Sequence, residues 1–191
     1  TCLGNNQYEI KLFVYRDCNS SGAPIDPSVV ITVFKGSNTN PFLAQNVPFN
    51  LNQNIPTNIN NPCLSAPPNI CTEYAVYTLV ATLPPSPDGY TISHQRCCRN
   101  GTIDNLVNPT SFGNTYTIEV PPNDSTCNSS PRFVNRPPIV LCLNDPLNLP
   151  LTATDPDGDS LFYELCNPLD GASSGNPNPG TSDPPPYSAV P

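Results

Sequence analysis

The sequence predicts an all-β, loop-rich protein stapled by disulfides, and three observations lead to that prediction. Proline accounts for 27 of 191 residues, which excludes a mainly helical chain because proline breaks helix interiors. Apolar residues make up 37% of the chain and gather in short runs typical of strands, which excludes a disordered chain. The third observation is that the chain contains nine cysteines.

Strand-like runs fill much of the first two thirds of the chain. Apolar patterning predicts strands at 8–15, 29–34, 73–83, 90–96 and 115–120, with a short strand or two among the long loops of 36–70. The run 29–34 is nearly all apolar, so we expect it to be buried on both faces. Six or seven strands separated by turn residues predict a β-sandwich over residues 1–122, either immunoglobulin-like or jelly-roll-like.

A second, shorter unit is predicted after a linker. Residues 123–131 are a linker by composition, and residues 132–169 contain strand-like runs at 132–135, 139–143, 147–153 and 160–166. Four strands are too few for an immunoglobulin-like sandwich, which takes ~7, so this unit is predicted to be incomplete. Either the protein continues past residue 191 or a neighbouring chain supplies the missing strands. Residues 170–191 form a Pro-rich, extended arm.

The charge balance excludes some partners. A formal net charge of −8 argues against binding to nucleic acid, whose phosphates need Lys and Arg. It also argues against electrostatic binding to anionic lipid. No apolar run approaches the ~18 residues that span a bilayer, so no membrane insertion is predicted.

The cysteines allow two interpretations. Zinc sites use closely spaced pairs, often with histidine, whereas this chain has no CxxC and one histidine. Disulfides in an oxidising compartment are therefore favoured, which makes the chain a secreted protein. The adjacent pair Cys97 and Cys98 should point to opposite faces of a strand and so bridge to two different partners. Because the count is odd, one thiol is expected to be free, to pair with another chain, or to have lost its partner to truncation. The nine are Cys2, Cys18, Cys63, Cys71, Cys97, Cys98, Cys127, Cys142 and Cys166.

One acidic turn is a candidate metal site. Asp155, Asp157 and Asp159 place three carboxylates around Gly158, and Ca²⁺ binds oxygens of this kind. The pattern lacks the flanking helices and the final Glu of an EF-hand. The alternative is a tight turn held by Asp side chains.

Several residues are candidate glycosylation sites. Asn-X-Ser/Thr sequons predict attachment at Asn19, Asn100, Asn123 and Asn128, all in predicted loops. Ser125 and Ser160 follow aspartates in short motifs that resemble bacterial surface O-glycosylation signals. The alternative is chance occurrence in a chain rich in Asn and Ser.

The sequence does not predict an enzyme. His94 is the only imidazole, and a Cys–His dyad would need a free thiolate beside it. Tyr74, Tyr77, Tyr90 and Tyr116 could stack on sugars, although core or cross-strand packing is the alternative.

Three stretches, 1–18 (TCLGNNQYEIKLFVYRDC), 95–109 (QRCCRNGTIDNLVNP) and 128–169, resemble segments of large secreted surface proteins of Bacteroidetes-type bacteria. Those relatives are gliding-motility-associated or PKD-containing proteins exported by type IX secretion. Within the third stretch, ATDPDGDSLFYEL also resembles cadherin-like repeats, in which the matching aspartates bind Ca²⁺. The resemblance implies an extracellular, cell-surface location and a Cys142–Cys166 bridge. The sequence departs from the relatives in two ways, because they begin with another strand before the Thr-Cys-Leu-Gly segment and continue far beyond the Pro-Pro-Pro-Tyr segment.

Together these features predict an extracellular structural protein of a bacterial surface. It is expected to be a subunit or module of an adhesive, pilus-like fibre, assembled as a homo-oligomer by strand donation between chains or as a tandem array. The candidate donor strands are 2–15 and 182–191. The alternative is a glycan- or protein-binding module of a long multidomain adhesin.

Overall fold

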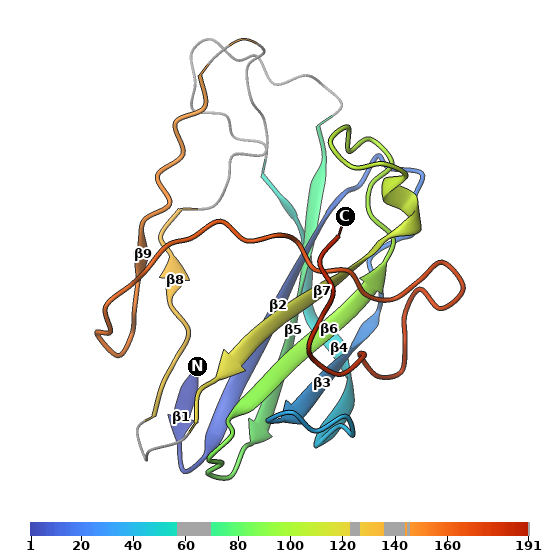
Figure 1. Ribbon diagram of the computed structural model, residues 1–191. Helices are drawn as coiled ribbons and strands as arrows, with labels where there is room; N and C mark the ends of the chain where they lie inside the picture. Colours follow the sequence, from blue (N-terminus) through green and yellow to red (C-terminus); the bar gives the residue numbers. More distant parts are fainter. Residues whose placement is uncertain (57–69, 123–126, 136–143, 145, 191) are drawn as a thin grey trace.

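A computed structural model describes residues 1–56, 70–122, 127–135, 144 and 146–190. Seven strands form one antiparallel sheet that curls into a half-barrel (Figure 1). The sheet order is β1-β2-β5-β4-β3-β6-β7. The all-β prediction is confirmed. The strands are β1 (Cys2–Gly4), β2 (Gln7–Asp17), β3 (Ser28–Lys35), β4 (Leu43–Ile55), β5 (Thr72–Thr82), β6 (Tyr90–Cys97) and β7 (Gly113–Val120).

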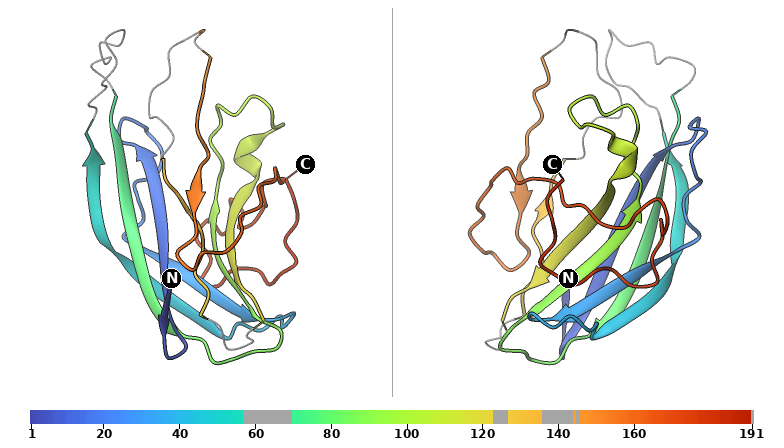
Figure 2. Two further views of the ribbon diagram at one scale, coloured as in Figure 1. Left: turned by 90° about the vertical axis from the view of Figure 1, so that its left-hand side faces the viewer. Right: turned by 45° about the vertical axis from the view of Figure 1, so that its right-hand side comes forward.

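Strand β4 makes the sheet fold over on itself. Its first half pairs with β3 and its second half with β5, with a register shift between Phe49 and Leu51. The predicted sandwich is thus built from one sheet, with β1, β2 and β5 in one layer and β3, β6 and β7 in the other (Figure 2). Only Val47 of β4 is fully buried, so this long strand lacks the clear alternation that marks the others.

The core lies between the two layers. Alternate residues of β2, β3, β5 and β6 point inward, and Tyr77, Val33 and Ile31 are almost fully buried there. Burying one large apolar side chain contributes about 1.5–3 kcal/mol. As predicted, β3 is buried on both faces.

The C-terminal arm covers the outer face of β3 and β6 and reaches β7 (Figure 1). Ser182 N–H donates to Thr32 Oγ1 at 2.9 Å, and Asp183 N–H donates to Gln95 Oε1 at 3.0 Å. Thr115 N–H donates to Leu169 O at 3.1 Å. The arm turns at Ser173–Asn176 and folds back so that Ala189 bridges Leu169, and it is bound to its own sheet.

Of the strands predicted for the second unit in its described residues, only short parts form. Two short strands, β8 (Arg132–Phe133) and β9 (Ala153–Thr154), pair with each other. The runs 160–166 and most of 147–153 are not strands, because no described strand lies beside them to complete their hydrogen bonds. The run 139–143 lies outside the described residues.

Three disulfides join cysteines of the described residues: Cys2–Cys127, Cys18–Cys71 and Cys97–Cys98. The prediction that Cys97 and Cys98 have different partners is wrong. β6 ends at Cys97, so strand alternation does not continue to Cys98, and the two Cα atoms are 3.0 Å apart across a cis peptide bond. Cys166 is a free, exposed thiol, so the structure does not show the implied Cys142–Cys166 bridge. Cys63 and Cys142 lie outside the described residues.

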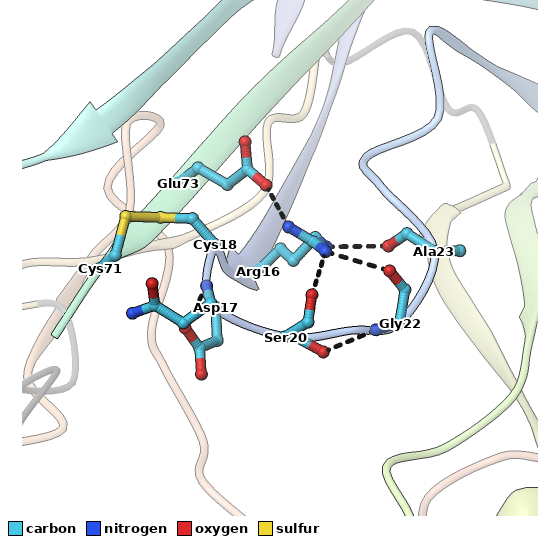
Figure 3. Close-up of polar contacts among 9 residues, drawn as sticks. Arg16, Asp17, Cys18, Ser20, Gly22, Ala23, Cys71 and Glu73 are labelled. Carbon is cyan, nitrogen blue, oxygen red and sulfur yellow. Dashed lines mark hydrogen bonds and ion pairs between the residues drawn. A yellow bond between two sulfur atoms is a disulfide. The ribbon is translucent and has the colours of Figure 1, made fainter. Parts of the chain in front are cut away.

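Arg16 holds the loop that follows β2 (Figure 3). Its guanidinium donates to the main-chain oxygens of Ser20, Gly22 and Ala23 at 2.7, 3.1 and 2.8 Å. Arg16 Nη1 also pairs with Glu73 Oε1 at 2.7 Å, close to the Cys18–Cys71 bridge. The fork of the guanidinium therefore fixes the loop leading toward Asp26 and β3.

Replacing Arg16 by lysine is expected to lower the free energy of unfolding by about 2 kcal/mol. An ammonium keeps the charge but cannot donate to several oxygens in a planar fork. Urea unfolding measures the effect. Lys11→Gln is the control, since its ion pair with Glu9 is more exposed and its loss should change stability much less than the loss of Arg16. Equal stability of both variants would contradict the assigned role of Arg16.

Candidate functional site: the groove between the two edge strands

The half-barrel does not close, and β2 and β7 are the strands that face its opening (Figures 1 and 2). β1 covers the outer edge of β2 only as far as Glu9, whose backbone exchanges two 2.8 Å hydrogen bonds with Thr1. From 10 to 17, no described strand pairs with that edge. The outer edge of β7 is bridged at Thr115 by Leu169, and from 116 to 120 it has no described strand partner.

Core-facing side chains are exposed along this opening. Tyr116 and Ile118 point inward from β7, yet they are 53% and 44% exposed. Leu12 and Val14 of β2 are only partly buried. In a closed sandwich, residues at inward positions lie in the core. Among the residues that the structure describes, no strand therefore covers the core at this position.

We call this opening the β2–β7 groove. It comprises an apolar cavity of about 100 Å³ and a more polar cavity of about 450 Å³. Its walls and floor include Ile10, Leu12, Val14, Val29, Ile31, Tyr77, Ile92, His94, Arg96, Tyr116 and Ile118. The groove is thus apolar along most of its length.

The charged groups at the polar end neutralise each other. Arg96 Nε donates to Asp26 Oδ2 at 2.6 Å and Arg96 Nη2 to Asp26 Oδ1 at 3.2 Å, with both side chains about three-quarters buried. The Tyr77 hydroxyl donates to the main-chain oxygen of Asp26. Burial, reinforced by the charge of Asp26, raises the pKa of Tyr77 to about 12. This end offers a neutral surface, which suits an uncharged ligand.

His94 forms part of the groove floor and is held neutral. Its Nδ1–H donates to Val30 O at 3.0 Å, and its ring stacks on Tyr116 with centroids 6.4 Å apart. Burial lowers the pKa of His94 below its ordinary value of 6.5. Cys97 and Cys98 are bonded to each other, so neither supplies the thiolate that a Cys–His dyad needs.

The neutral state of His94 predicts a pH dependence of stability. As pH falls from 6.5 toward the lowered pKa of the folded state, the unfolded chain binds the proton first, so the free energy of unfolding decreases. Since the chain has one histidine, His94→Asn should remove this part of the slope while keeping a donor for Val30 O. Chemical denaturation between about pH 5 and 7 measures both proteins. Identical slopes would contradict the burial of a neutral imidazole.

The acidic turn uses its carboxylates to hold backbone. Asp155 Oδ1 accepts from the N–H groups of Asp157 and Asp159 at 2.8 and 3.2 Å. Asp157 Oδ2 accepts from Ser129 N–H, and Asp159 Oδ2 from Asn128 Nδ2 at 3.4 Å. Within the described residues, no group of three acidic, His or Cys side chains is placed to hold a metal ion.

Calcium binding at this turn stays a prediction, and melting curves with and without a chelator test it. A lower melting temperature in chelator would support a bound ion, since a ligand of the folded state raises stability. An unchanged curve would leave the aspartates as turn-forming residues.

The other candidate residues are spread over the surface. Asn19, Asn100 and Ser160 are exposed in loops, and Asn128 is half-buried beside Asp159. Asn123 and Ser125 lie outside the described residues. Attachment of glycan stays a prediction at all six.

The four tyrosines considered for sugar stacking fall into different environments. Tyr77 and Tyr90 are buried in the core, as the packing alternative expected. Tyr116 lines the β2–β7 groove, and Tyr74 stacks with Tyr15 on the outer face of the sheet. The sequence did not identify the groove, because the apolar alternation of 115–120 is the same for a central strand and an edge strand.

No protein-family model, curated protein or solved structure matches this chain. Within the described residues, no helix is long and apolar enough to cross a membrane.

Proposed function

We propose that this chain is a structural module of an extracellular bacterial surface fibre, in which neighbouring chains are joined by β-strand addition. The observation that carries the proposal is the β2–β7 groove, where core-facing Tyr116 and Ile118 are half exposed between two strand edges. An added strand would bury these side chains and continue the sheet.

The groove suits a peptide strand better than a small polar ligand. A strand gains affinity from main-chain hydrogen bonds to the sheet edges and specificity from alternate side chains placed in apolar pockets. The paired Arg96 and Asp26 leave no unbalanced charge for an ionic ligand. Burial of apolar surface contributes roughly 25 cal/mol per Å², so a strand that covers the groove would gain affinity from the apolar side chains exposed there.

Two further features support an extracellular setting. Three disulfides occur among the described residues, and such bonds persist in oxidising environments. The net charge of −8 suits a surface protein that does not bind nucleic acid.

Electron microscopy of the chain isolated from its native source tests the proposal. We expect regular fibres in which one chain is the repeating unit. Single particles at all concentrations, or irregular threads of unlike beads, would contradict a fibre built from this chain.

A glycan-binding module is the second candidate, and the outer face of β2, β5 and β4 favours it. Tyr15 and Tyr74 stack there with centroids 5.8 Å apart, and Gln53 Nε2 donates to the Tyr74 hydroxyl. Exposed aromatic rings and amide groups on a flat face can bind sugars by stacking and hydrogen bonding. Glycan-array binding that is lost in Tyr15→Ala and kept in Phe162→Ala would support this function over the fibre.

A further inference from the structure

We propose that the strand filling the β2–β7 groove is the segment Ser160–Cys166 of a second copy of this chain. We call this stretch (SLFYELC) the donor segment. This inference rests on the proposed assembly by strand addition and names its partner.

The donor segment has the composition of a strand but belongs to none. Leu161, Tyr163 and Leu165 would share one face of a strand, because side chains alternate with a period of two. In the structure Phe162 is 86% exposed and Leu165 102% exposed. Apolar side chains displayed together in this way mark interaction sites. The Tyr163 hydroxyl accepts an exposed hydrogen bond from Ala153 N–H, which docking would exchange for contacts in the groove.

The stretch from Leu161 to Leu169, which contains most of the donor segment, is too long to lie along its own β7. Leu161 and Ile118 line the same cavity, and Leu169 O accepts a hydrogen bond from Thr115 N–H. Eight residue steps of this stretch thus connect points only three residues apart on β7, and an extended residue spans ~3.3 Å. The chain must therefore bulge away from its own edge (the orange-to-red stretch after β9 in Figure 1), and Leu165 lies on this bulge.

The acceptor groove matches the donor segment in length and character. Eight residues of β2, from 10 to 17, and five of β7, from 116 to 120, line the opening, and no described strand pairs with their outer edges. Leu161, Tyr163 and Leu165 would face the apolar floor, and Glu164 would face outward on the side of Lys11. Since β2 and β7 are five places apart in an antiparallel sheet, they run in opposite directions. A single inserted strand is therefore antiparallel to one of them and parallel to the other.

Candidate donors 2–15 and 182–191 are both engaged in their own chain. The first forms β1 and most of β2, and β2 pairs with β5 along its whole length. In the second, Ser182 is buried against the sheet and Val190 is buried against the arm itself. Donating either would break contacts already made, whereas the donor segment has none of comparable extent.

A matched pair of substitutions tests the donor. Leu165→Asp places a charge on the inward face and should weaken self-association by about 100-fold or more, measured by analytical ultracentrifugation. Phe162→Asp lies on the opposite face and should associate like the wild type. Both side chains are exposed in the monomer, so neither change should alter its melting temperature. Equal association of the two variants would overturn the assignment of the donor.

Mixing donor and acceptor variants tests the direction of pairing. Ile118→Asp should block the groove while leaving the donor segment intact. Each variant alone should be monomeric, and a mixture of Leu165→Asp with Ile118→Asp should form pairs that stop at two chains. A mixture that stays monomeric, with both variants folded, would overturn the inference.

A cross-link locates the contact. Cys166 would face outward near β7, so Thr117→Cys should form an intermolecular disulfide with it under mild oxidation. Thr78→Cys lies on central strand β5, beyond the ~7 Å Cα separation that a disulfide spans, and should not. Adding Cys166→Ser to Thr117→Cys should abolish the link, and a link that persists would overturn the pairing.

The outcomes separate the inference from the function on which it rests. A wild-type chain that never associates overturns both. Fibres unaffected by Leu165→Asp overturn the donor assignment and keep the fibre. Closed pairs that need both Leu165 and Ile118 support the strand pairing and overturn the fibre.

Discussion

Replacing Gly113 by alanine is expected to release the C-terminal arm from the sheet. A Cβ atom at this position would lie 1.6 Å from the main-chain oxygen of Gly171, so backbone rather than a flexible side chain would have to move. The displacement would break the bonds from Gly113 N–H to Asp170 Oδ1 (2.8 Å) and from Thr115 N–H to Leu169 O (3.1 Å). We expect a loss of about 3 kcal/mol in the free energy of unfolding.

Hydrogen exchange and chemical denaturation measure this effect. The amides of Thr115 and Ser182 should lose protection in the Gly113→Ala variant, since both donate across the contact between arm and sheet. Gly175→Ala is the control, because it lies in the same arm and its nearest atom would be 3.9 Å from the new Cβ. If both variants match the wild type, the arm is not held at Gly113.

Removing the Cys2–Cys127 bridge is the second change with a large expected effect. The bridge joins residues 125 apart, and the chain-entropy model assigns about 4–5 kcal/mol to a loop of that size. It also fixes β1 beside the segment in which Ser129 Oγ accepts from Cys2 N–H at 3.1 Å. The Cys2→Ser/Cys127→Ser variant should therefore unfold at much lower denaturant concentration than the wild type.

Two comparisons make this result specific. Cys166→Ser removes a free thiol and should leave the denaturation midpoint unchanged. Cys18→Ser/Cys71→Ser opens a loop of 53 residues and should be slightly less destabilising on the entropic account. If the Cys2→Ser/Cys127→Ser variant is as stable as Cys166→Ser, the long bridge does not constrain the unfolded chain.

The fold was predictable where apolar patterning is strong. Strands β2, β3, β5, β6 and β7 occur where the pattern places them. The first four bury alternate or consecutive side chains in one core, and β7 pairs with β6 along its length. The sequence did not predict β4 as one long strand. Only Val47 of β4 is fully buried, and the two halves of the strand pair with different strands, β3 and β5. The run 160–166 has the pattern of a strand but no described partner, and patterning alone cannot supply one.

The candidate site was less predictable than the fold. The proline-rich arm and the acidic turn were identified from local sequence, and the turn does place Asp155 as the acceptor of two N–H groups. The groove depends on which strands fail to pair, and that is decided by residues far apart in the chain. From the sequence, Tyr116 and Ile118 are therefore predicted to lie in the core. In the structure they are half exposed, because the sheet is open beside them.

The pairing of Cys2 with Cys127 also constrains the order of events during biosynthesis. All seven strands of the large sheet end before residue 127, so Cys2 stays without its partner until the last of them has emerged. Cys18, Cys71 and the adjacent pair become available to oxidants earlier. If Cys2 is oxidised before Cys127 has emerged, it can only form a non-native bridge, and thiol–disulfide exchange must then correct that bridge.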